Sequence, residues 1–129
     1  MIVVRFLPLL LLAAAPVSAQ GLTVRTGETW VFTVDRGQPA NARRVDAPTK
    51  ARKGEVQVSV RAMMGTTMTI RSNNPVAFTF NATLLGKTGP VAVRTCTLPA
   101  NGRPAFESWP PPSTGVRLSD FKPATRGTC

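Results

Sequence analysis

Apolar and polar residues alternate along several segments of this chain, with the period of two that is typical of a half-buried β-strand. The clearest segment is 55–62, where Val56, Val58 and Val60 face one way and the polar residues between them face the other. The same alternation marks segments 22–25, 29–34, 42–45, 67–71, 76–85 and 91–96. The pattern therefore predicts about seven strands, most with one buried face.

Turn-forming residues separate these segments. Gly65 divides 55–62 from 67–71 and predicts a hairpin, while Asn73 and Asn74 followed by a proline predict a turn before the next strand. No segment keeps a helical period over three turns. We expect an all-β fold, a small immunoglobulin-like antiparallel β-sandwich. A small β-barrel is the alternative, because alternation does not show whether a sheet closes on itself.

The N-terminal residues have the pattern of a secretory signal peptide over 1–19. One arginine precedes an apolar run over 6–15, and the small residues at 17–19 match a signal peptidase site. Cleavage would leave residues 20–129, a length that fits a single domain. The apolar run is shorter than the roughly 20 residues that span a bilayer. We therefore expect no integral membrane segment after cleavage, and a periplasmic or extracellular location.

Prolines gather in region 98–129, which contains six of the 12 in the chain. Proline favours extended and turn conformations and cannot donate to a strand ladder. We therefore expect a Pro-rich strap across the sandwich, with one edge strand over 115–119. Its large apolar residues are expected to be buried, namely Phe106, Trp109, Val116, Leu118 and Phe121.

The chain contains two cysteines, Cys96 and Cys129. An even number of cysteines in an exported chain predicts a disulfide, which would tie the last residue back to the strand predicted over 91–96. A metal-binding or redox pair is the alternative, but the separation is unlike that of a Cys-x-x-Cys motif.

The chain is strongly basic, with 16 basic and 6 acidic residues and a net charge of +10. Removing the signal peptide, which contains Arg5, leaves +9. The largest group of cations comprises Arg43, Arg44, Lys50, Arg52 and Lys53. Such a group can attract an anionic envelope polymer, although a solvated loop is the alternative interpretation. We expect no nucleic-acid partner, because the aromatic residues occupy predicted inward positions instead of alternating with arginine.

Candidate catalytic chemistry is sparse. The chain has no histidine, which excludes Ser-His-Asp and Cys-His catalytic groups and His-ligated zinc. The carboxylates are scattered, so we expect no enzyme, with a hydrolase whose carboxylates meet in space as an alternative. Met63, Met64 and Met68 raise a second alternative, a periplasmic Cu(I) carrier, because thioether sulfur suits Cu(I). The alternation instead places Met64 and Met68 on the core face, with Met63 at the turn.

These features predict an exported basic β-sandwich that works by binding, or by structural association with, an envelope component or a protein partner, without catalysis or cofactor. A protein partner could add a strand to an exposed sheet edge.

Overall fold

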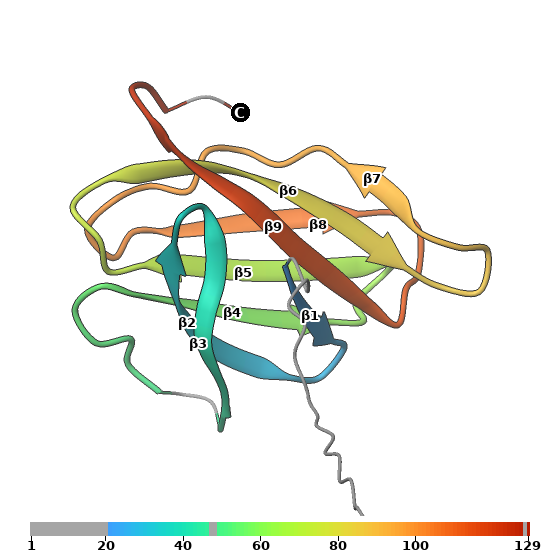
Figure 1. The fold of residues 1–129 in the computed structure, drawn as a ribbon. Helices are drawn as coiled ribbons and strands as arrows, with labels where there is room; N and C mark the ends of the chain where they lie inside the picture. The colour runs from blue at the N-terminus through green and yellow to red at the C-terminus, as the bar shows by residue number, and fades with distance from the viewer. Residues whose placement is uncertain (1–20, 47–48, 128) are drawn as a thin grey trace, which may run out of the picture.

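The computed structural model describes residues 21–46, 49–127 and 129, and these residues form nine β-strands and no helix. Two antiparallel sheets face each other (Figure 1). One has four strands in the order β1-β9-β6-β7, and the other has five in the order β3-β2-β4-β5-β8. The predicted β-sandwich is confirmed, and the sheets are not closed into a barrel. The predicted signal peptide, 1–19, lies outside the described residues.

The strands agree in most places with the alternating segments. The four-stranded sheet contains β1 (Leu22–Arg25), β9 (Gly115–Ala124), β6 (Ala77–Leu85) and β7 (Val91–Val93). The five-stranded sheet contains β3 (Gln38–Val45), β2 (Thr29–Asp35), β4 (Glu55–Arg61), β5 (Thr66–Ser72) and β8 (Pro104–Trp109). Two hairpins, β2–β3 and β4–β5, lie within one sheet, so the strand order differs from the ABED and CFG sheets of immunoglobulin domains.

The hydrophobic core lies between the two sheets. Val56, Val58 and Val60 of β4 are fully buried, as their alternation predicts. Phe121 of β9 joins the sheets, because its ring packs against Phe32 of the opposite sheet at a centroid distance of 5.6 Å. Burial of such apolar side chains is the main favourable contribution to folding.

The Pro-rich C-terminal region differs from the expected strap. It contributes two strands, and β9 is an interior strand between β1 and β6, not an edge strand over 115–119. Four of its six prolines lie at the start of a strand or in a connection: Pro104 begins β8, and Pro110, Pro111 and Pro112 lie in the β8–β9 connection, whereas Pro123 lies within β9. The predicted apolar residues are buried except Phe106, which is 69% exposed.

Segment 94–98 follows β7, which ends at Val93, earlier than predicted. Leu98 exchanges two backbone hydrogen bonds with Phe78 of β6. On the other side, the indole Nε1 of Trp109 donates to the carbonyl of Arg94 at 3.0 Å. A disulfide joins Cys96 to Cys129, which confirms the predicted pair. The segment is thus attached to both sheets.

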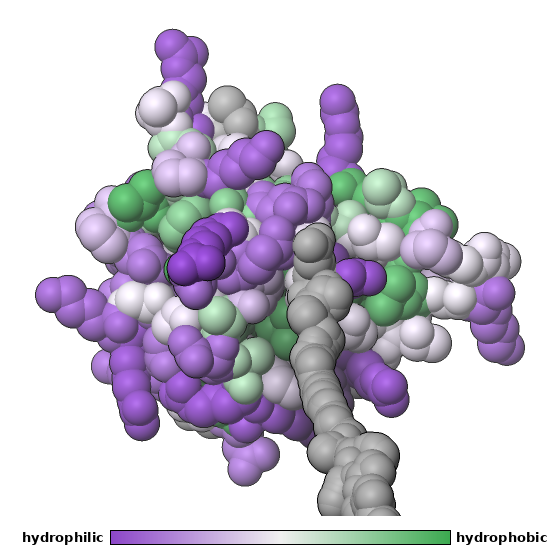
Figure 2. Space-filling model, viewed as in Figure 1, coloured by the Kyte–Doolittle hydropathy of each residue, from purple (hydrophilic) through white to green (hydrophobic). Residues whose placement is uncertain are grey.

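The outer face of the four-stranded sheet is mainly hydrophilic, and apolar residues gather on it towards β7 (Figure 2), where Val91 is 48% exposed. Among the described residues, no helix is long and apolar enough to span a membrane.

Candidate functional site: a polar groove on the five-stranded sheet

The connection between β3 and β4 crosses the outer face of the five-stranded sheet. β3 and β4 lie on opposite sides of β2, and Val45 at the end of β3 pairs with Thr29, whereas Glu55 at the start of β4 pairs with Thr33. The connecting residues therefore have to pass over β2. Val31 of β2 points away from the main core and is nevertheless fully buried.

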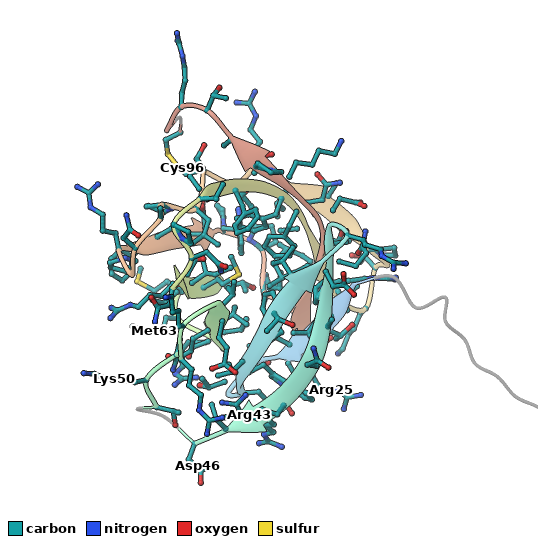
Figure 3. All side chains as sticks on the ribbon, turned by 60° about the vertical axis from the view of Figure 1, so that its left-hand side comes forward. Arg25, Arg43, Asp46, Lys50, Met63 and Cys96 are labelled. Atoms are coloured by element: carbon teal, nitrogen blue, oxygen red, sulfur yellow. A yellow bond between two sulfur atoms is a disulfide. The ribbon has the colours of Figure 1, made fainter. Side chains whose placement is uncertain are left out.

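A groove with a volume of about 490 Å³ lies between this connection and the sheet. Its floor is formed by outward side chains of β4 and β5, namely Gln57, Ser59, Thr69 and Arg71. Its wall is residues 49–51, and Asn73 and Gly102 close one end. Figure 3 shows Lys50 on this connection, with its side chain directed away from the sandwich. The lining therefore offers hydroxyl, amide and cationic groups.

Glu55 fixes the wall of the groove. Its carboxylate accepts hydrogen bonds from Nη1 of Arg43 at 2.6 Å and from the backbone N–H of Arg52 at 2.8 Å. The hydrogen bond from Arg43 holds the pKa of Glu55 below its ordinary value, against the effect of burial. Glu55 thus attaches the edge strand β3 and the connection to the start of β4.

Asn73 fixes the end of the groove. Its backbone N–H donates to the carbonyl of Glu55 at 2.8 Å, and its carbonyl accepts from Gly54 at 2.7 Å. Its side-chain Nδ2 donates to the carbonyl of Ala51 at 3.1 Å. The floor and wall are therefore joined by hydrogen bonds before any ligand binds, which lowers the entropic cost of binding.

The groove is electropositive. Arg71 and Lys50 line it, and neither forms an ion pair with any of residues 21–46, 49–127 and 129. No carboxylate is among the described residues that line the groove. Glu55, close by, is compensated by Arg43. An anion in the groove would therefore meet the uncompensated charge of Arg71, and Lys50, whose side chain is directed outward from the wall (Figure 3), adds a second positive charge at its margin.

The predicted basic cluster is divided by the structure. Arg43 is bound to Glu55, while Arg44, its neighbour on β3, forms an ion pair with Glu28 at 3.3 Å. Successive residues of a strand point to opposite faces, so these two arginines do not act together. Of the five predicted cations, Lys50 lines the groove. The sequence interpretation missed Arg71, although it lies on the polar face of a segment predicted as a strand.

The predicted methionine group is also divided. Met68 is fully buried, whereas Met63 and Met64 are 62% and 99% exposed. The expectation that Met64 faces the core was wrong, because it lies in the β4–β5 turn at a φ of 48°, outside the alternation of β5. The three sulfur atoms therefore cannot share one Cu(I) ion in this fold. Among the described residues, no group of three or more Cys, Asp or Glu residues is arranged to hold a metal ion.

The acidic residues have separate partners. Glu28 accepts from the indole of Trp30 at 3.0 Å, Asp120 accepts from Gln38 at 2.8 Å, and Glu107 accepts from the backbone of Cys96. Among the described residues, no two carboxylates accept a hydrogen bond from the same donor. The arrangement therefore lends no support to a catalytic carboxylate pair.

No protein family model, no curated protein and no solved structure matches this chain.

Proposed function

We propose that this chain is an exported, non-catalytic binding protein that holds an anionic envelope component in the groove of the five-stranded sheet. The observation that carries the proposal is a groove whose described lining includes Arg71 and Lys50, neither of them ion-paired with a described residue, and no carboxylate. Export is supported by the signal-peptide pattern of 1–19 and by the cysteine pair.

An extended ligand suits this site better than a small one. The groove runs along the surface of the sheet and is bounded by a connection on one side, without a deep enclosed cavity. The remaining cations spread over the molecule add a general attraction for polyanions, since 15 basic and 6 acidic residues lie in 20–129. A polymer with repeated negative charges would use both the groove and this field.

Binding to a soluble polyanion at several salt concentrations tests the proposal. The variant Lys50→Gln/Arg71→Gln removes both cations of the groove. Its matched control, Lys87→Gln/Lys122→Gln, removes the same charge from β9 and from the β6–β7 connection of the other sheet. We expect the groove variant to lose about tenfold or more in affinity at about 0.15 M salt, and the control to lose about twofold.

Equal losses for the two double variants would overturn the proposal, because binding would then depend on net charge alone. Both variants alter exposed side chains, so we expect their unfolding free energies to stay within about 0.5 kcal/mol of the parent protein.

A further inference from the structure

Strand β8 has an inverted polarity, with a carboxylate facing inward and an aromatic ring facing outward. Its inward residues are Ala105, Glu107 and Trp109, so a carboxylate is buried, while the intervening Phe106 points outward and is 69% exposed. A large apolar ring on an otherwise polar sheet face adds little to stability. A single exposed apolar side chain is common on protein surfaces, but an inward carboxylate next to an outward aromatic ring departs from the usual pattern, and such departures are expected at functional positions.

The register of the sheet places Phe106 next to the groove. Phe106 pairs with Thr69 of β5, and Thr69 pairs with Ser59 of β4, so the three side chains form one row on the outer face. Neighbouring strands lie about 4.8 Å apart, which makes this row roughly 10 Å long. A second row, from Gln57 to Arg71, runs beside it.

The ring also lines a second depression of about 370 Å³, together with Pro99 and the Cys96–Cys129 disulfide. Phe106 therefore lies between Thr69 of the groove and this second depression at the free edge of β8.

The polar groups of the groove suit a ligand that both donates and accepts hydrogen bonds. The side chains of Gln57 and Thr69 make no hydrogen bond with any described residue, and each contains an acceptor oxygen as well as a donor. A bare polyphosphate offers acceptors and negative charge, and would leave these acceptor oxygens unused. Sugar hydroxyls would use them.

Resting on the proposed function, we infer that the ligand is a saccharide polymer bearing anionic groups. The carboxylate or phosphate of one unit contacts Arg71 and Lys50, the hydroxyls contact Gln57 and Thr69, and the C–H face of a sugar ring packs on Phe106. Aromatic rings attract polarised C–H groups through their negative faces, which explains why a phenylalanine would be kept exposed at this position.

The experiment compares three polymers: polygalacturonate, polyphosphate and uncharged dextran. Two variants of the same position are used, Phe106→Leu, which keeps apolar bulk without a ring, and Phe106→Trp, which keeps a ring. We expect Phe106→Leu to weaken polygalacturonate binding about five- to tenfold, Phe106→Trp to retain it, and neither to change polyphosphate binding. Dextran should bind at least tenfold more weakly than polygalacturonate.

Saccharide recognition and anion binding by the groove are tested separately by these measurements. Unchanged polygalacturonate binding by Phe106→Leu, with a clear loss for Lys50→Gln/Arg71→Gln, would overturn the saccharide inference and leave the anion groove intact. Tighter binding of polyphosphate than of polygalacturonate would also overturn the saccharide inference and leave the anion groove intact. Dextran binding as tight as polygalacturonate would show that the anionic groups are not recognised. If Lys50→Gln/Arg71→Gln bound both polygalacturonate and polyphosphate as tightly as the parent protein, the proposed function itself would be overturned.

Discussion

The Oε2 atom of Glu107 accepts a hydrogen bond of 2.7 Å from the backbone N–H of Cys96. The carboxylate projects from β8 into the sandwich, and the residue is only 7% exposed. It therefore anchors segment 94–98, which belongs to no strand, to the edge of the five-stranded sheet. Burial raises the pKa of Glu107, and the hydrogen bond from Cys96 acts in the opposite direction.

This relationship predicts that Glu107→Gln stabilises the protein at neutral pH. A raised pKa means that the folded state binds this proton more tightly than the unfolded chain does. The stabilisation from the protonated group is thus present below the ordinary pKa of 4.5 and is lost as pH rises through the raised folded value. Glutamine is uncharged at every pH and keeps an acceptor for Cys96.

Thermal unfolding of both proteins between pH 3.5 and 7.5 checks this. We expect the variant to melt a few degrees higher at pH 7, and the difference to disappear below about pH 4. A variant that is less stable at pH 7 would show that the charged hydrogen bond to Cys96 outweighs the cost of burial.

The disulfide should contribute to stability through the same segment. Cys96 and Cys129 close a loop with a sequence separation of 33. The chain-entropy relation gives about 3 to 4 kcal/mol for a loop of this length. We expect Cys96→Ser/Cys129→Ser to lose about that amount in urea unfolding, with faster amide exchange in segment 94–98. Thiol titration of the denatured parent protein should detect no free thiol; two reactive thiols would contradict the pairing.

Glu55 and Arg43 should hold the wall of the groove. The pKa of Glu55 is lowered first by Arg43, so its contribution is present above the ordinary value of 4.5 and is lost as pH falls through the lowered folded value. We expect Glu55→Gln to cost about 1 kcal/mol at pH 7, a modest value because the Arg43 side chain is 39% exposed. Amide exchange at Arg52 and Gly54 should become faster.

Asp35 provides the matched control for that variant. Its contact with Arg36 is 4.0 Å long, and both side chains are largely exposed. Asp35→Asn should therefore change the free energy of unfolding by less than about 0.5 kcal/mol and leave exchange at Arg52 unchanged. Similar effects of the two variants would show that Glu55 has no special role in the wall.

Local alternation was sufficient to predict most of the strands and an all-β fold, because a period of two indicates that one face of a strand is buried, but it left a sandwich and a barrel both open. The valines of β4 and the phenylalanines of β6 are buried as their spacing predicts. Strand order was not predictable, since it depends on which hairpins share a sheet. β8 and the length of β9 were missed because prolines suggested irregular structure, although Pro104 merely begins a strand.

The groove was not predictable from the sequence for a related reason. Gln57 and Arg71 are opposite each other only because β4 and β5 pair in one register, and Lys50 joins them only because the β3–β4 connection crosses the sheet. The run of cations around Arg43 looked like one surface, but strand alternation separates Arg43 from Arg44. Proximity in sequence was therefore a poor guide to the site.

Met68 and Met64 should respond in opposite ways to the same substitution. Met68 is fully buried in the core, so Met68→Ala removes packed volume and should cost about 2 to 5 kcal/mol in urea unfolding. Met64 is 99% exposed, so Met64→Ala should change stability by less than about 0.5 kcal/mol.

Titration of the parent protein with Cu(I) under reducing conditions should give no saturable heat, because two exposed thioethers at a turn form an incomplete ligand set. Saturable binding abolished by Met68→Ala alone, with its fold intact, would contradict the burial of this side chain.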